Sequence, residues 1–233
     1  MKLIDMKKDI GFLLMTISQL YFAQVNYVIK DGSERFDAHI TVQSCEDESC
    51  NEKGIVKLID KKTNQLFQTF ESDDLSLFLD KDQKPTVNVI QLYNEQSPLI
   101  FDDFNFDGSE DLAIRNGNNS GYGGPSYDIY VYHSTKKQFV PSDELTSLAY
   151  DNLGMFQTDH DRKRIITFAK SGCCWHITTE YAVIPKKGLQ KVYEMEEDAT
   201  GGGEFVKVIT RNLINNKWVI KTKKYKLDEY YKD

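Results

Sequence analysis

The chain has 233 residues, of which 40% are hydrophobic and 12% aromatic, and this is enough to bury one good core. Nothing in the composition demands a second domain. The formal net charge of −7 argues against nucleic acid as a partner, because phosphates repel an acidic protein.

The first 23 residues have the layout of a secretory signal peptide. Lysines precede an apolar run at 10–22, and Ala23 follows that run. The run is too short and too mixed for a comfortable membrane span, so the competing interpretation is a buried or anchoring N-terminal helix. We expect cleavage after Ala23, export to the periplasm or the cell surface, and no membrane span in the mature chain at 24–233.

The first pair of cysteines, Cys45 and Cys50, stands in the stretch SCEDESC. An even number of cysteines in an exported chain favours disulfides over free thiols. A bridge between these two would staple a turn, with only modest loop entropy to gain. The first hairpin is predicted directly afterwards, at 54–70, where two β-branched and aromatic alternations flank the polar turn KKTN.

The stretch DFNFDGSED at 103–111 carries the strongest signal in the sequence. Oxygen-bearing side chains stand at alternate positions around Gly108, between the strand-like stretches PLIF and LAI. Three carboxylates packed this closely repel one another unless a divalent cation lies among them. Ligands that are all oxygen favour calcium over zinc or copper. We therefore predict a calcium loop joining two strands, with an acidic turn that binds no metal as the alternative.

The position of each ligand follows from the spacing of the loop. Ile114 stands where an EF-hand has its bidentate glutamate, so Asp111 is expected to complete the shell, and Ser109 is expected to contribute its backbone carbonyl. The predicted ligands are Asp103, Asn105, Asp107, Ser109 and Asp111.

The glycine-rich segment NGNNSGYGGPSY at 116–127 is the predicted recognition element. Its glycines free the backbone, while Tyr122 and Tyr127 supply large amphipathic side chains. Tyrosine gives much contact area at low entropic cost, so both residues are candidates for contact with a partner. The alternative is a flexible surface loop without a partner.

Three further elements follow in the second half of the chain. A hairpin is predicted at 127–140, a short helix at 141–150 and a charged hairpin turn at 158–164. In the helix, Ser142 is suited to cap the first turn.

The second pair of cysteines, Cys173 and Cys174, is adjacent in the stretch GCCWH. A vicinal disulfide competes here with bridges to other cysteines, and the sequence does not separate them. Cys174 and His176 have the composition of a thiol nucleophile with its base, or of two zinc ligands, but a disulfide is the preferred interpretation. Because the sequence holds no separate pair of acid–base carboxylates, no supported Ser-His-Asp arrangement and no phosphate-binding glycine loop, an enzyme is not indicated.

Two more hairpins, at 176–195 and 205–225, complete the series. The lysines of the last strand alternate with other residues, as on the solvated face of a strand. Hairpins that repeat in this way predict an all-β fold of antiparallel hairpins in an incomplete or irregular β-propeller-like arrangement, with a β-sandwich as the alternative.

The run FDDFNFDGSEDLAIRNG at 101–117 resembles the calcium motif of FG-GAP and VCBS repeats. Together with the stretches at 123–132, 154–165 and 171–183, it resembles a family of exported bacterial calcium-binding proteins with an incomplete, propeller-like β-fold. The characterised kind is the immunity protein of a Xanthomonas type IV secretion system, which inhibits a peptidoglycan-degrading, lysozyme-like effector in the periplasm. The resemblance covers residues 99 to 195.

This resemblance implies a function in binding a protein. It implies that a loop carrying Tyr122 enters the cleft of a cell-wall hydrolase. From length and composition we expect residues 24–233 to form a single β-rich calcium-binding domain. A cell-surface adhesion or carbohydrate-binding module with a structural calcium site is the alternative. We expect no activity as an enzyme.

Overall fold

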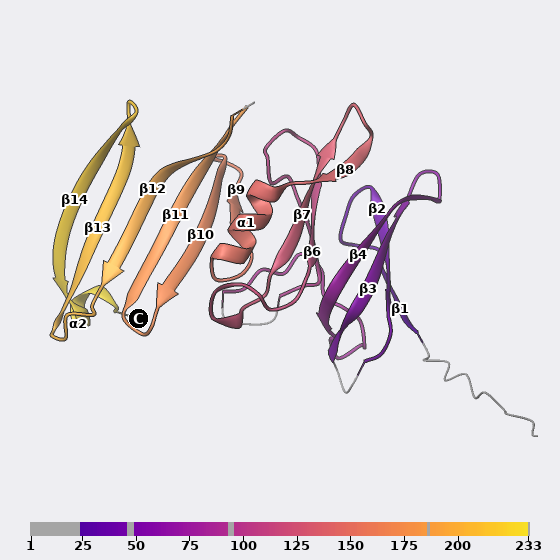
Figure 1. The fold of residues 1–233 in the computed structure, drawn as a ribbon, viewed down its shortest axis with the longest axis horizontal. Helices are drawn as coiled ribbons and strands as arrows, with labels where there is room; N and C mark the ends of the chain where they lie inside the picture. The colour runs from indigo at the N-terminus through magenta and orange to yellow at the C-terminus, as the bar shows by residue number, and fades with distance from the viewer. Residues whose placement is uncertain (1–23, 46–48, 93–95, 186, 233) are drawn as a thin grey trace, which may run out of the picture.

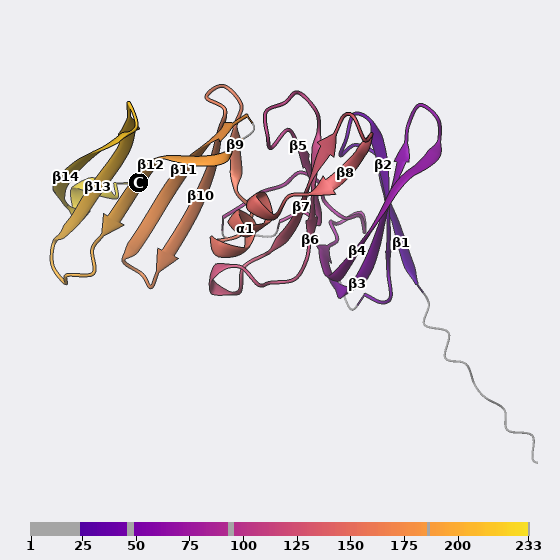
Figure 2. The ribbon, with the colours of Figure 1, turned by 45° about the horizontal axis from the view of Figure 1, so that its top comes forward.

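The computed structural model describes residues 24–45, 49–92, 96–185 and 187–232, so the predicted signal peptide lies outside the described residues. The described chain forms antiparallel sheets that stand in a row, as two views of the ribbon show (Figures 1 and 2). Each sheet is a meander in which every strand pairs with its neighbour in sequence. The all-β fold of antiparallel hairpins is therefore confirmed. None of these sheets closes into a barrel.

The strands divide among three sheets in the described part of the chain. The first sheet holds β1 (Val25–Ile29), β2 (Phe36–Val42), β3 (Ser49–Asp60) and β4 (Gln65–Phe78). The second holds β5 (Leu99–Asp102), β6 (Asp111–Arg115), β7 (Tyr127–His133) and β8 (Gln138–Pro141). The third holds β9 (Gln157–Asp159), β10 (Arg164–Ser171), β11 (Trp175–Ile184), β12 (Gly188–Asp198), β13 (Phe205–Ile214) and β14 (Lys217–Lys226).

The four predicted hairpins are confirmed as β3–β4, β7–β8, β11–β12 and β13–β14. Their turns contain residues with a left-handed backbone, such as Asn64 at φ 54° and Gly188 at φ 82°. Asparagine and glycine adopt this conformation at low cost, which is why the chain reverses there. The charged turn predicted at 158–164 also joins two strands, β9 and β10.

The second sheet lies between two hydrophobic clusters, and this explains the apolar runs that flank the acidic loop. Leu112 and Ile114 of β6 belong to the first core cluster, which the first and second sheets build together. Ala113, between them, belongs to the second core cluster, which also contains residues of α1 (Asp143–Asp151) and of β10. Since successive side chains of a strand point to opposite faces, a strand buried on both faces reads as a continuous apolar run.

The predicted helix at 141–150 is confirmed as α1, but its cap differs from the prediction. The Ser142 side chain makes no capping hydrogen bond, and its backbone carbonyl accepts from the N–H of Thr146 at 2.9 Å. In the first turn, a carboxylate oxygen of Glu144 accepts a 2.8 Å hydrogen bond from the N–H of Leu189. The helix thereby links the second sheet to the β11–β12 hairpin.

The third sheet ends in a solvated edge. Most of β14 is exposed, as the lysine alternation predicted, and the short helix α2 (Leu227–Tyr230) follows it. Among the described residues, no helix has the length and apolar character that a membrane span requires.

Candidate functional site

The acidic loop joins β5 to β6, and Asp111 is its anchor. The Asp111 side chain is fully buried. One carboxylate oxygen accepts hydrogen bonds from the backbone N–H groups of Phe104 at 3.0 Å and Asn105 at 3.3 Å. The other accepts from the N–H of Tyr132 at 2.8 Å. This one carboxylate therefore closes the loop on itself and attaches it to β7.

The other acidic side chains of the loop fold back over its backbone. The Asp103 carboxylate accepts from the N–H groups of Asp107 at 3.0 Å and Gly108 at 2.8 Å. The Asn105 amide oxygen also accepts from Asp107, at 2.9 Å. Gly108 has φ +88°, and no atom lies within 4 Å of the position that a Cβ would take, so glycine serves the backbone conformation here and not a close approach. The loop thus gathers the oxygens of Asp103 and Asn105 around the N–H of Asp107.

The carboxylates of this loop are electrostatic neighbours. Burial, together with the negative charges of Asp107 and Asp103, raises the pKa of Asp111 to about 7, against the hydrogen bonds from Tyr132 and Asn105. Carboxylate, amide and carbonyl oxygens within one short loop are the donor set that calcium prefers. However, no three His, Cys, Asp or Glu side chains of the described residues converge into a metal cluster.

The donor chemistry therefore fits calcium only if Asn105 and backbone oxygens complete the set. Asp111 is fully buried, whereas Asp103 and Asn105 are half-buried and Asp107 is exposed, so Asp103, Asn105 and Asp107 are the residues best disposed to hold the ion, with the Ser109 carbonyl. The ligand set of Asp103, Asn105, Asp107, Ser109 and Asp111 stays a prediction.

The loop lies at the junction of the three sheets. Glu110 accepts a hydrogen bond from the hydroxyl of Ser33, in the turn between β1 and β2. At the other end, Asp102 accepts from the hydroxyl of Thr158 on β9 and pairs with Nε2 of His160, in the turn between β9 and β10, at 2.8 Å. The loop is thus attached to both neighbouring sheets.

These attachments were not predicted from the sequence. His160 is isolated in the sequence, and neither Asp102 nor Glu110 occupies a predicted ligand position of the loop. Their partners lie far away along the chain, so no local pattern marks them.

Two hollows flank the loop. One has a volume of about 560 Å³ and lies between the loop, α1 and the β11–β12 hairpin, lined among others by Phe106, Asp107, Leu145, Lys163 and Leu189. The other, of about 460 Å³, lies toward the first sheet, lined among others by Arg35, Asp103, Ser109, Glu110 and Tyr132. The acidic loop therefore separates two concave surfaces.

The two tyrosines predicted to contact a partner have opposite environments. Tyr127 is fully buried, and its hydroxyl donates a 2.8 Å hydrogen bond to the carbonyl of Ser97. The prediction that Tyr127 contacts a partner was wrong, because it begins β7 with its side chain in the core. Tyr122 is 65% exposed, within the short 3₁₀ turn η1 (Gly121–Gly123).

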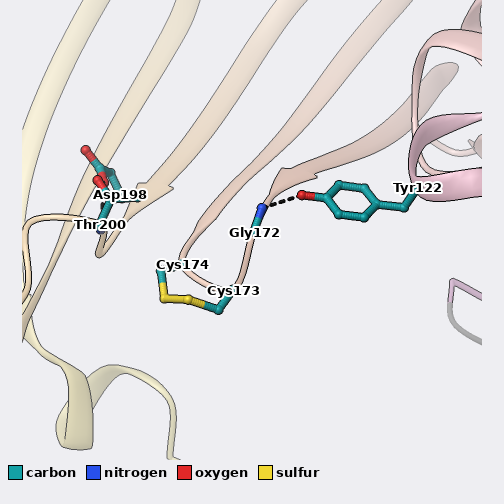
Figure 3. Close-up of a disulfide and its surroundings, with 6 residues drawn as sticks. All are labelled: Tyr122, Gly172, Cys173, Cys174, Asp198 and Thr200. Atoms are coloured by element: carbon teal, nitrogen blue, oxygen red, sulfur yellow. Dashed lines mark hydrogen bonds between the residues drawn. A yellow bond between two sulfur atoms is a disulfide. The ribbon is translucent and has the colours of Figure 1, made fainter.

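All four cysteines lie in the described part of the chain, and they form the pairs Cys45–Cys50 and Cys173–Cys174. Their Cα atoms are 4.2 Å and 3.7 Å apart, respectively. The vicinal bridge, shown in Figure 3, resolves the alternatives that the sequence left open. It leaves no free thiol for a nucleophile or a zinc ligand at Cys174, and the ring of His176 stacks on Phe168 instead.

Comparison with known proteins yields a fold relationship. No family model matches the chain, and no curated protein matches it significantly. A solved structure titled "Structure of a Xanthomonas Type IV Secretion System related protein" is similar to it, with a TM-score of 0.62 and 19% sequence identity. The similarity covers 86% of this chain and 93% of the other. At this identity, the likeness establishes the shared fold.

Proposed function

We propose that this protein is an exported, calcium-binding, non-enzymatic protein that binds a peptidoglycan hydrolase through the loop carrying Tyr122 and inhibits it. The observation that carries the proposal is the state of Tyr122, a large side chain that is 65% exposed on a left-handed backbone. The fold shared with a protein related to a type IV secretion system supports a role in secretion-associated protein binding.

Tyr122 contributes nothing to the buried core of the protein itself. Its φ of 58° lies in the left-handed region, which costs a non-glycine residue of order 1 kcal/mol or more. Residues 121 and 123, on either side, are both glycine. A glycine at position 122 would adopt the left-handed conformation without this strain. A tyrosine that accepts this strain without becoming buried is typical of a contact residue, since tyrosines recur as anchors of interfaces.

Calcium would act as a structural clamp in this proposal. An ion among Asp103, Asn105 and Asp107 would neutralise the repulsion between neighbouring carboxylates. The loop is attached to the first sheet through Ser33 and to the third through Thr158 and His160. Fixing the loop would therefore fix the sheets and the segment after β6 that carries Tyr122. The resemblance to FG-GAP and VCBS loops supports this assignment.

The calcium proposal predicts a melting temperature that depends on the metal. Wild-type protein should melt higher in calcium than in chelator, because a ligand at about one hundred times its Kd stabilises the native state by roughly 2.7 kcal/mol. Asp107→Ala should melt at the same temperature in both solutions. Asp82→Ala, which removes an exposed acidic side chain from the turn that follows β4, is the matched control and should keep the difference. If chelator leaves the wild-type melting curve unmoved, the clamp is absent.

The inhibitor proposal is tested by the loss of turbidity of a peptidoglycan suspension. Wild-type protein should slow at least one enzyme of a panel of purified lysozyme-like hydrolases. Tyr122→Ala should weaken that inhibition about tenfold or more, as loss of an interface anchor does. Leu66→Ala, which removes a similarly exposed apolar side chain from the first sheet, should not.

The alternative function is tested in the same samples. A hollow of about 560 Å³ beside the acidic loop is suited in size to a small ligand, which favours a carbohydrate-binding module as the second candidate. Such a module would cosediment with peptidoglycan in the absence of any hydrolase and would leave every enzyme of the panel uninhibited. That pair of results would replace the inhibitor proposal.

A further inference from the structure

The turn between β10 and β11 holds Tyr122 from the neighbouring sheet. The backbone N–H of Gly172 donates a hydrogen bond to the Tyr122 hydroxyl, across the gap between the second and third sheets (Figure 3). The ammonium nitrogen of Lys170 lies 5.1 Å from the centroid of the Tyr122 ring. Both contacts come from a single strand end, so the orientation of Tyr122 depends on that of this turn.

The same turn contains the vicinal disulfide. Cys173 and Cys174 follow Gly172 directly, and Gly172 has φ +65°, a conformation that suits glycine. A bridge between adjacent residues closes a small ring through their peptide bond and so restricts the backbone next to the donating N–H. Since a loop this short offers little closure entropy, the bridge adds little to global stability, and its effect is local.

The neighbouring turn supports the disulfide turn in its place. The N–H of Ala199 donates a 2.8 Å hydrogen bond to the carbonyl of Cys174. Asp198, one residue earlier, accepts hydrogen bonds from both the N–H and the hydroxyl of Thr200, which orders that second turn (Figure 3). A series of turns thus leads from the β12–β13 connection to the hydroxyl of Tyr122.

We propose that the turn at 171–174, closed by the Cys173–Cys174 disulfide, is the positioning support of Tyr122 and forms the second part of the surface that contacts the partner. This inference rests on the proposed function, since the partner is the cleft of a cell-wall hydrolase. Cys173 is exposed and directly follows Gly172, whose N–H binds the Tyr122 hydroxyl, so a cleft that receives the tyrosine meets the disulfide turn as well.

The two disulfides provide a matched pair of variants. Cys173→Ala with Cys174→Ala removes the bridge beside Tyr122. Cys45→Ala with Cys50→Ala removes the bridge of the first sheet, where Cys50 is buried in the first core cluster. The second variant should lower the melting temperature more, because it removes core packing, yet it should leave Tyr122 in place.

Positioning is measured first without any partner, by hydrogen exchange of the Gly172 amide in NMR spectra. We expect the exchange to be about tenfold faster in the Cys173→Ala, Cys174→Ala variant and in Tyr122→Phe, because each removes or loosens the acceptor of that amide. The Cys45→Ala, Cys50→Ala variant should match wild type. Equal exchange in wild type and in the Cys173→Ala, Cys174→Ala variant would overturn the positioning role.

The contact is measured by inhibition of the hydrolase that wild-type protein inhibits. Removing the Cys173–Cys174 bridge should raise the inhibition constant about tenfold, and removing the Cys45–Cys50 bridge should not. Combined with Tyr122→Ala, loss of the vicinal bridge should add less than its separate effect, since both act through one side chain. Full inhibition without the vicinal bridge overturns this inference while the proposed function stands. If wild-type protein inhibits no hydrolase, the proposed function and this contact surface are both overturned. The exchange experiment still decides whether the turn positions Tyr122.

Discussion

The hydroxyl of Tyr127 is a polar group buried in the hydrophobic core. It lies in the second core cluster, and its hydrogen bond to the Ser97 carbonyl joins the start of β7 to the segment before β5. Burial raises its pKa, so the phenol stays protonated and donates at neutral pH. A buried donor and acceptor that satisfy each other contribute to stability chiefly because either would be costly alone.

Tyr127→Phe should therefore destabilise the protein although it removes one atom. The substitution leaves the Ser97 carbonyl without this donor, and we expect the free energy of unfolding to fall by about 1–2 kcal/mol. Urea titration followed by fluorescence measures the change. Tyr193→Phe, at a half-buried position of β12, is the control and should change the value by less than about 0.5 kcal/mol. Equal effects of the two variants would contradict the role given to the Tyr127 hydroxyl.

At the scale of residues, local spacing predicted which residues pair, but not whether a given side chain is buried or exposed. The Cys45–Cys50 bridge followed from six neighbouring letters, and the strands on either side of the acidic loop followed from their apolar runs. Tyr122 and Tyr127 looked alike because both stand in one glycine-rich segment. Only the start of β7 separates them, since it turns Tyr127 inward together with Ile129, two residues later.

Among the elements, three inner strands of the third sheet are joined by side chains across the ladder. The Glu196 carboxylate of β12 accepts hydrogen bonds from the guanidinium of Arg211 on β13 at 2.7 Å and from Nε1 of Trp175 on β11 at 3.1 Å. The bond from Arg211, and then that from Trp175, lowers the pKa of Glu196 below its ordinary value of 4.5. One carboxylate thus connects three adjacent strands.

This connection predicts a dependence of stability on pH. Because the pKa of Glu196 is lower in the folded than in the unfolded protein, its stabilising effect is present above about pH 4.5 and is lost as the pH falls through the folded pKa. Glu196→Gln should reduce the melting temperature at pH 7 and flatten the fall of the melting temperature below about pH 4.5. Glu71→Gln, at an exposed position of β4, should leave the profile of wild type unchanged. A profile for Glu196→Gln parallel to that of wild type would contradict the assignment.

Hairpins were the most predictable elements, because a period-two alternation around a polar turn is a local signal. The pairing of β1 with β2 was not predicted, although both strands alternate buried and less buried residues. The division into three sheets was not predictable either. The division depends on which strands become the edges of a sheet. The contacts that decide this join residues far apart in the sequence, such as Phe36 and Phe139, whose ring centroids are 5.6 Å apart.

For the whole molecule, the exposed edge strand of the third sheet is a site where two copies of the protein can pair. β14 is an exposed strand with free backbone groups on its outer side, and Trp218 and Ile220 on it are 42% and 60% exposed. Its lysines, at 217, 221, 223, 224 and 226, give a basic strand on an acidic protein. Lysines on an edge strand oppose pairing with a second copy, because like charges would meet across the new ladder.

Removing these charges should therefore promote self-association. Lys221→Thr with Lys223→Thr should raise the mass of the protein above that of wild type as concentration rises, measured by size-exclusion chromatography with light scattering. Lys81→Thr with Lys84→Thr, in the exposed turn that follows β4, changes the net charge equally and should remain at the wild-type mass. Association of both variants to the same degree would attribute the effect to net charge alone.

The meander order of the sheets also bears on how the chain reaches its native state. Every strand pairs with the strand before or after it, so each ladder forms between segments that are never far apart along the chain. Such a low contact order favours rapid folding, because little loop entropy is lost before contacts form. Distant segments meet later, in the two core clusters and in the contacts between sheets, such as that of Ser33 with Glu110. A chain that leaves the ribosome or a translocation pore with its N-terminus first can pair its first four strands before the acidic loop appears. The loop then forms against a sheet that is already in place.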